Sequence, residues 1–238
     1  MVARQASASS TFARGDTPPF AGPVSLENGD RLTRCEFERR YRARPDLNKV
    51  ELIEGVVYMP SPVRADSHAK PNGAILGWLS VYSASTPGVS MLPDATVRLD
   101  GDNEPQPDAL LRIDADAGGQ SRLSADDYVE GPPELIVEVA ASSVARDLHD
   151  KLNAYRRNGV LEYIVWRVHD RAVDWFVLAE DEYRPLDPDK DGLLASTVFP
   201  GLRLDVDALL AGDFARVLAV QQEGLDSPGR AVFATRPT

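Results

Sequence analysis

The chain has 238 residues, with 26 Lys and Arg against 37 Asp and Glu, which gives a formal net charge of −11. This acidic balance argues against a protein that coats nucleic acid, because nonspecific binding to phosphates depends on clustered basic residues. The sequence contains no run of about 18 apolar residues that could span a membrane, and its N-terminus lacks the apolar segment of a secretory signal. We therefore expect a cytoplasmic protein that makes no membrane contact.

The composition indicates one globular domain. Apolar residues make up 43% of the sequence, which is enough to build a core at this length. Residues 1–24 and 223–238 mix Ser, Ala, Pro and Gly without periodicity, so we predict a disordered tail at each end. The single cysteine, Cys35, cannot form an intramolecular disulfide, so the stability of residues 25–222 has to come from the core.

The first part of the predicted domain contains two helices on either side of a hairpin. Residues 32–43 have apolar side chains near helical spacing, with Thr33 as a candidate N-cap. Residues 50–59 predict two short strands that turn at Glu54-Gly55, since glycine readily adopts the positive φ of a tight hairpin. Residues 66–83 carry apolar side chains along one helical stripe, which predicts the second helix.

The rest of the predicted domain alternates between strands and helices. Apolar side chains at helical spacing predict helices at residues 144–159 and 205–220. Together with the strands, these helices predict an α/β fold, in which helices pack on the faces of a β-sheet. The strands are predicted from short apolar runs bounded by Gly, Pro and Asp, and they cover residues 89–99, 107–113, 134–140, 163–168 and 172–178.

Two carboxylates stand out because they occupy strands that should be buried. Alternation along residues 134–140 places Glu138 among apolar neighbours, where an unpaired charge is costly. Asp108 would also be a buried carboxylate, because it lies at the start of the apolar strand predicted at residues 107–113. Antiparallel pairing of these two strands would bring the carboxylates together, and a divalent cation with oxygen ligands would then offset their repulsion.

Lys151 is the first lysine after this pair of acids, and it falls on the helix that follows Glu138. A lysine is a compact charge that can position a water molecule or stabilise the charge of a phosphoryl-transfer transition state. Asp147 lies one helical turn earlier, so a surface ion pair between Asp147 and Lys151 is an equally supported interpretation. The spacing alone does not separate the two interpretations.

Several stretches of the chain carry a combined pattern: VELIEGVVYMPSP, His68, QPDALL and ELIVEVAASSVARDLHDKLNAYRRNGVLEYIVW. Together they resemble the bacterial Uma-two family of restriction endonucleases, which belongs to the PD-(D/E)XK nuclease superfamily, and the similarity extends over about residues 32–210. The resemblance implies a restriction-endonuclease-like core, a mixed β-sheet flanked by helices, with an N-terminal β-hairpin. It also implies Mg²⁺, with Mn²⁺ as a substitute, bound by acidic residues at the strand ends.

The resemblance assigns roles to individual positions. Asp108 matches the acid of the PD element and Glu138 matches the acid of the second element. With the backbone carbonyl of Val139, these two residues would bind the metal ion. Lys151 matches a lysine that this family carries on the helix, whereas the superfamily usually has it two residues after the glutamate, where this chain has Ala140.

Three further residues are candidates for auxiliary roles. Glu51 matches a frequent Glu of the family and could add a metal ligand, although an exposed strand carboxylate is the preferred interpretation. His68 falls where members often have a histidine; it could contact a phosphate or transfer a proton, while a structural role at a helix start is about equally supported. Asp147 shares a helical stripe with Lys151 and Tyr155, and we expect Tyr155 to be a core residue.

The residues and the resemblance together predict a Mg²⁺-dependent endonuclease that hydrolyses phosphodiester bonds in DNA. Arg146, Arg156 and Arg157 surround the helix that carries Lys151, and they are candidates for contacts with DNA phosphates. Because cutting both strands of a duplex usually requires two sites, we expect a homodimer.

Two other classes of function are consistent with the sequence. A non-catalytic interaction protein could retain the nuclease fold without hydrolysis, and the acidic balance together with the missing strand lysine favours this alternative. A metal-free hydrolase could instead use Asp108 and Glu138 as acid and base, as glycosidases do, but Lys151 would then have no role.

Overall fold

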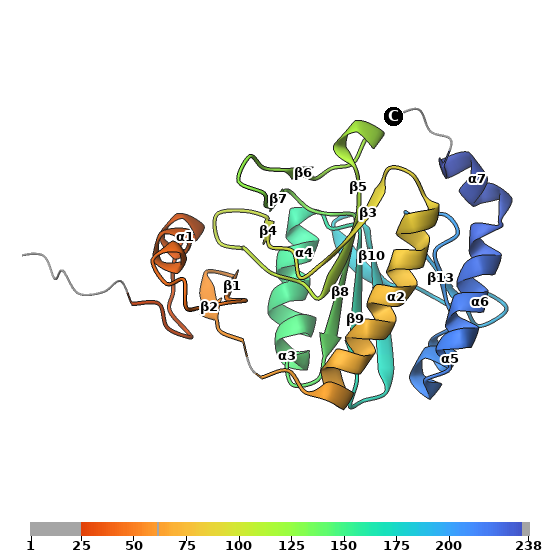
Figure 1. Ribbon diagram of the computed structural model, residues 1–238, viewed down its shortest axis with the longest axis horizontal. Helices are drawn as coiled ribbons and strands as arrows, with labels where there is room; N and C mark the ends of the chain where they lie inside the picture. The colour runs from red at the N-terminus through yellow and green to blue at the C-terminus, as the bar shows by residue number, and fades with distance from the viewer. Residues whose placement is uncertain (1–24, 61, 235–238) are drawn as a thin grey trace, which may run out of the picture.

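A six-stranded mixed sheet forms the centre of the computed structural model, which describes residues 25–60 and 62–234 (Figure 1). The strand order is β11-β10-β9-β8-β5-β3, and only β8 and β9 run parallel to each other. The mixed sheet agrees with the predicted fold class. Its strands are β3 (Val89–Pro93), β5 (Ala109–Ile113), β8 (Leu135–Ala140), β9 (Glu162–Arg167), β10 (Ala172–Ala179) and β11 (Glu182–Pro185).

Helices cover both faces of this sheet (Figure 1). Helix α2 (Lys70–Ser85) packs on the face to which Leu135, Val137 and Val139 of β8 point. The opposite face carries Ile136 and Ala140 and is covered by the predicted helix at residues 144–159. Alternation along β8 is therefore as predicted, and it directs Glu138 toward the second of these helices.

The helix after β8 contains a wider turn in its middle. It consists of α3 (Val144–Arg146), the π-helical segment η3 (Asp147–Lys151) and α4 (Leu152–Asn158). Gly159 follows with φ of +85° and ends the helix at the predicted position. A second π-helical segment, η1 (Ala65–Ala69), leads into α2. Both π-helical segments carry residues that line the same pocket, described below: Ser67 and His68 of η1 and Lys151 of η3.

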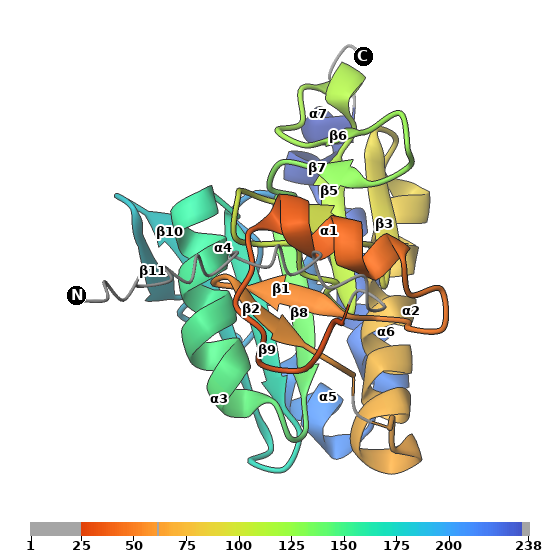
Figure 2. The same ribbon diagram turned by 90° about the vertical axis from the view of Figure 1, so that its left-hand side faces the viewer.

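An N-terminal unit, residues 25–60, packs around its own apolar cluster and lies beside the main domain (Figures 1 and 2). It consists of α1 (Arg34–Arg42) and the predicted hairpin, formed by β1 (Glu51–Ile53) and β2 (Val56–Tyr58). Glu54 and Gly55 both have positive φ at the turn, as this type of hairpin requires. Backbone hydrogen bonds between Leu52 and Glu104 join the unit to the main domain.

Short elements complete the fold. Strands β4 (Val97–Arg98), β6 (Arg122–Leu123) and β7 (Val129–Glu130) form a small sheet, and β12 (Leu194–Ala195) pairs with β13 (Arg203–Leu204). A 3-10 turn, η2, covers Ala115–Ala117. Over the described residues, no helix is both long and apolar enough to cross a membrane.

The C-terminal part differs from the prediction. The single helix predicted at residues 205–220 is two helices, α5 (Val206–Ala211) and α6 (Phe214–Leu225), because Gly212 ends the first with φ of +78° and Asp213 caps the second. The disordered tail predicted from residue 223 is helical to residue 234, since α6 continues and α7 (Pro228–Ala234) follows. The buried side chains of Leu225 and Phe233 join the core there. The predicted tail at residues 1–24 and residues 235–238 lie outside the described residues.

A close backbone approach fixes α6 against the loop before β13. A Cβ atom added to Gly224 would lie 2.2 Å from the carbonyl oxygen of Gly201, so Gly224→Ala forces the helix away. We expect this variant to lose about 1–3 kcal/mol of unfolding free energy, the usual cost of overpacking. Gly229→Ala is the matched control, because a Cβ at Gly229 of α7 meets nothing within 4 Å. Equal unfolding free energies for both variants in urea titration would contradict this account.

Candidate active site

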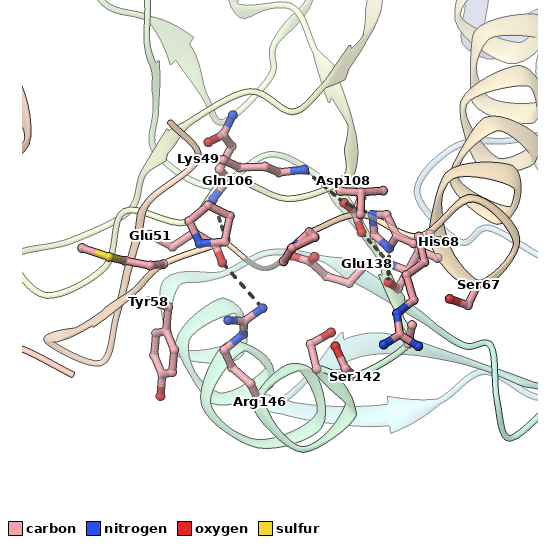
Figure 3. A pocket seen from close by; sticks show the side chains of 18 of the residues that line it. Lys49, Glu51, Tyr58, Ser67, His68, Gln106, Asp108, Glu138, Ser142 and Arg146 are labelled. Atoms are coloured by element: carbon pink, nitrogen blue, oxygen red, sulfur yellow. Dashed lines mark hydrogen bonds and ion pairs between the residues drawn. The ribbon is translucent and has the colours of Figure 1, made fainter. Parts of the chain in front are cut away.

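A pocket of about 460 Å³ lies where β5, β8, η1, η3 and the N-terminal unit meet (Figure 3). Its lining includes Asp108 and Glu138, both buried. Strands β5 and β8 pair antiparallel with Ala109 opposite Val137, so the residues one step further along, Asp108 and Glu138, reach the same place. The predicted convergence of the two acids is thus present in the fold, and the antiparallel register is its cause.

Asp108 is held by the neighbouring strand and by a histidine. Its Oδ2 accepts a hydrogen bond of 2.8 Å from the Val139 amide, and its Oδ1 lies 3.3 Å from Nε2 of His68. Nδ1 of His68 lies 2.9 Å from the Val139 carbonyl oxygen. The Asp108 carboxylate raises the pKa of His68, so the imidazolium form fits best, because both ring nitrogens then donate.

The electrostatics favour ionised Asp108. Burial opposes its ionisation, but the hydrogen bonds from His68 and from the Val139 amide outweigh this effect, and the pKa of Asp108 lies below its ordinary value. His68 therefore contacts two of the three groups that the resemblance assigns to a metal ion, the Asp108 carboxylate and the Val139 carbonyl. The sequence offers two roles for His68, one in the chemistry and one at the start of a helix. The structure adds that His68 lies next to Asp108 and the Val139 carbonyl.

Lys151 lines the pocket as a buried cation. Its Nζ is 2.7 Å from Oε1 of Glu138 and 2.8 Å from Oε1 of Glu51. The hydroxyl of Tyr155, which is a fully buried core residue as expected, donates to the same Glu138 oxygen at 2.9 Å. The alternative of a surface ion pair with Asp147 is wrong, because Asp147 and Lys151 are each only 1% exposed. The helix instead turns Lys151 toward the acids.

Buried carboxylates outnumber the cations near Lys151. Burial lowers the pKa of Lys151, but Glu138, Glu51 and Asp147 outweigh it and raise that pKa above its ordinary value. Burial, together with the carboxylates of Asp147, Asp108 and Glu51, raises the pKa of Glu138 above its ordinary value, although the Lys151 ammonium opposes this shift. Burial is the largest cause of the shift at Glu138 but acts against the shift at Lys151. The neighbouring carboxylates raise both pKa values, and an additional cation would relieve this excess of negative charge.

Glu51 corrects one sequence interpretation. The preferred interpretation was an exposed strand carboxylate, but Glu51 is 6% exposed. Its Oε1 accepts from Lys151 and, at 2.9 Å, from the backbone amide of Gln106. The N-terminal unit places this residue against the helix after β8, so Glu51 binds the lysine across two parts of the chain.

Of the three arginines predicted to contact DNA phosphates, only Arg146 lines the pocket. Its guanidinium lies 5.0 Å from the ring centre of Tyr58 and 3.9 Å from Oε2 of Glu51. Arg156 donates to the carbonyl of Asp181, and Arg157 pairs with Glu54 and Asp100 on the surface. These two arginines are therefore engaged elsewhere.

Two more residues belong to the description of the site: Asp147, which the sequence predicted as an auxiliary residue, and Lys49, which it did not. Asp147 accepts a short hydrogen bond from Ser143 and is buried beside the pocket wall. Lys49 lines the pocket with its Nζ 3.6 Å from Oδ1 of Asp108, and sequence reasoning missed it. The available signal was its type, since the chain has only four lysines.

The donor set of the pocket suits a hard divalent cation. Asp108, Glu138 and the Val139 carbonyl supply oxygen atoms only, which is the preference of Mg²⁺ and Mn²⁺. Within residues 25–60 and 62–234, no group of three or more His, Cys, Asp and Glu side chains is suited to hold a metal ion. Two carboxylates and one carbonyl still fit Mg²⁺, because this ion retains several water ligands.

The mixed sheet and the paired acids place the protein in the class with a restriction-endonuclease-like fold. Residues 35–207 match the Uma2 family, described as "Putative restriction endonuclease", so the chain belongs to that family and the resemblance is confirmed. The crystal structure of "a putative nuclease belonging to DUF820" from Anabaena variabilis ATCC 29413 has a similar fold, with a TM-score of 0.54 and 14% identity. The similarity covers 76% of this chain and 98% of that one. No curated protein matches this chain.

Proposed function

We propose that the protein is a Mg²⁺-dependent endonuclease that hydrolyses phosphodiester bonds in DNA. The observation that carries the proposal is the convergence of Asp108, Glu138 and the Val139 carbonyl at one pocket, with the buried ammonium of Lys151 2.7 Å from Glu138. Membership of the Uma2 family supports the same class of reaction. A homodimer that cuts both strands stays a prediction from the substrate.

In this proposal, the residues that line or support the pocket have separate roles in binding and catalysis. Asp108, Glu138 and the Val139 carbonyl would hold the divalent ion, which supplies Lewis acidity and lowers the pKa of a bound water. Lys151 is fixed by Glu51 and Glu138, so its positive charge stays close to the reacting phosphate without rearrangement. Arg146 on the pocket wall binds a phosphate oxygen of the strand. Tyr155 fixes the rotamer of Glu138 from below.

Cleavage of supercoiled plasmid in Mg²⁺ or Mn²⁺ tests this proposal. We expect the wild type to nick the plasmid, and Asp108→Ala and Glu138→Ala to lose at least about 100-fold in rate, since each removes a charged ligand worth several kcal/mol. Asp116→Ala is the matched control, because this acid lies exposed on η2 and outside the pocket lining.

Metal binding provides a readout that does not depend on the substrate. Titration calorimetry with Mn²⁺ should show one or two sites on the wild type and on Asp116→Ala, and loss of binding on Glu138→Ala. A wild type that binds the metal ion but leaves DNA intact in both metals would favour the non-catalytic interaction protein. Equal nicking by all variants would indicate a contaminating nuclease, and activity that resists EDTA would favour the metal-free hydrolase.

A further inference from the structure

Lys49 brings a second ammonium group to the acids, and it comes from a different part of the chain than Lys151. Lys49 points toward Asp108 in Figure 3. Its Nζ lies 3.6 Å from Oδ1 of Asp108 and 2.6 Å from Oδ1 of Asp94. The side chain is one-third exposed and lines the pocket. Lys151 also lines the pocket but is only 1% exposed, whereas Lys49 lies where solvent and a ligand can reach it.

The backbone that presents Lys49 is in an unfavourable conformation. Lys49 has φ of +57° and its partner Asp94 has φ of +49°, and the left-handed region is costly for a lysine, which has no local hydrogen bond to offset it. Gln106 donates from Nε2 to the Asp94 carbonyl at 2.6 Å, which holds this segment in place. The surrounding structure therefore enforces the position of the lysine.

Stability does not explain this arrangement. Both side chains of the Lys49–Asp94 pair are substantially exposed, and ion pairs of this kind contribute little net free energy. Aspartate tolerates left-handed backbone, but at Lys49 this conformation costs more than such a pair returns. Other residues with positive φ, such as Glu54 and Glu180, lie at hairpin turns, whereas Lys49 lies at the pocket, so its location links it to the site.

The charges around the pocket indicate what Lys49 binds. Lys49 lies beside Asp108, and Arg146 lies beside Glu51, so cations flank the acids on two sides. A nucleic-acid strand that passes over buried carboxylates meets repulsion on its phosphates, and flanking cations offset that repulsion. The ammonium of Lys49 can contact a phosphate while Asp94 keeps it in position.

We propose that Lys49 is a substrate-binding residue that contacts a phosphate of the nucleic-acid strand next to the one that is cleaved. This inference rests on the proposed endonuclease function. It assigns a substrate contact to the N-terminal unit, which then contributes both Lys49 and Glu51 to the site.

Lys49→Asn separates a role in binding from a role in folding. Asparagine tolerates the left-handed conformation, so the variant removes the charge without adding backbone strain. Lys49→Arg keeps the charge, and Lys190→Asn is the control, because Lys190 is 90% exposed and outside the pocket. All three are made in a Glu138→Gln background, in which the DNA stays intact.

The measurement is the fluorescence anisotropy of a fluorescein-labelled DNA duplex over a series of salt concentrations. We expect Lys49→Asn to bind about 10-fold more weakly at low salt, with a salt slope smaller by about 1, as for loss of one phosphate contact. Lys49→Arg should restore most of the affinity, and the Tm of Lys49→Asn should equal or exceed that of its background. In the cleaving protein, Lys49→Asn should raise KM more than it lowers kcat.

Three outcomes of these measurements would contradict the assignment of Lys49 to phosphate binding. Unchanged affinity and salt slope in Lys49→Asn, with a wild type that binds and cuts DNA, would overturn the assignment of Lys49 alone. A lowered Tm with unchanged affinity would show a structural role instead. A wild type that neither binds nor cuts DNA would overturn the proposed function as well.

Discussion

Replacement of Lys151 by methionine is expected to abolish cleavage and to lower the free energy of unfolding by about 3–5 kcal/mol near neutral pH, the usual cost of breaking a buried ion pair from one side. Methionine has a similar length and fits the apolar surroundings, so the loss comes from charge and not from volume. Glu51 and Glu138 both contact the Lys151 ammonium, and both would stay buried without it.

Urea titration and plasmid cleavage measure the two effects. Lys190→Met is the matched control, since its side chain is 90% exposed. A double variant, Lys151→Met with Glu138→Gln, should recover part of the stability, because one unpaired charge is removed, but none of the activity. A Lys151→Met protein that unfolds like the wild type would show that the lysine is not required to neutralise the acids.

The acids of the site could be predicted because their positions follow from a local rule. Alternation along residues 134–140 fixes the face on which Glu138 lies, and antiparallel pairing with the strand after Asp108 fixes its neighbour. Both rules act between adjacent strands and need no knowledge of the remaining chain. The hairpin at residues 50–59 was predictable for a similar reason, because its turn requires positive φ.

The cationic part of the site depends on contacts that no periodicity encodes. Glu51 meets Lys151 only because the N-terminal unit packs against the helix after β8, 100 residues later in the chain. The π-helical turn over Asp147–Lys151 changes the direction of side chains in a way that α-helical spacing does not predict. The sequence therefore left the role of Lys151 undecided and gave Glu51 the wrong environment.

The C-terminal segment shows the same limit of prediction from sequence, here for the fold and not for the site. Gly, Pro and Ser at residues 223–229 are typical of a disordered tail, yet the buried Leu225 and Phe233 anchor helices there. Composition measures local preference, whereas burial against a distant surface decides the outcome.

Three separate parts of the chain thus meet at one site. The sheet supplies Asp108 and Glu138, the helix after β8 supplies Lys151, and the N-terminal unit supplies Glu51 and Lys49. The central sheet is held by long ladders of backbone hydrogen bonds. The N-terminal unit is joined to the main domain by backbone hydrogen bonds to residues 101–104 and by side-chain ion pairs, so these contacts should control the integrity of the site.

Glu104 is the contact at which this dependence can be measured. Its backbone pairs with Leu52 of β1, and its buried side chain contacts Glu38 of α1 next to Arg98. Burial, together with the neighbouring Glu38 carboxylate, raises the pKa of Glu104 from 4.5 to about 8. Glu104 therefore carries a proton below about pH 8, and this proton removes the charge repulsion between the two neighbouring carboxyl groups.

The sign of the pH dependence follows from this raised pKa. The stability that the protonated group contributes is fully present below about pH 4.5 and is lost as the pH rises through about 8. We expect the unfolding free energy of the wild type to fall by on the order of 2–4 kcal/mol between these values because of this residue. Glu104→Gln is uncharged at every pH and should show a flatter profile, with higher stability than the wild type above pH 8.

Hydrogen exchange locates the effect and connects it to function. In the wild type, raising the pH through 8 should reduce the protection of the backbone amides of α1 and β1 more than that of β8 and β9, after correction for intrinsic exchange rates. In Glu104→Gln this selective loss should disappear, and cleavage should persist to higher pH, because Lys49 and Glu51 stay at the pocket. A uniform loss of protection over all four elements, equal in both proteins, would mean that Glu104 does not hold the N-terminal unit in place.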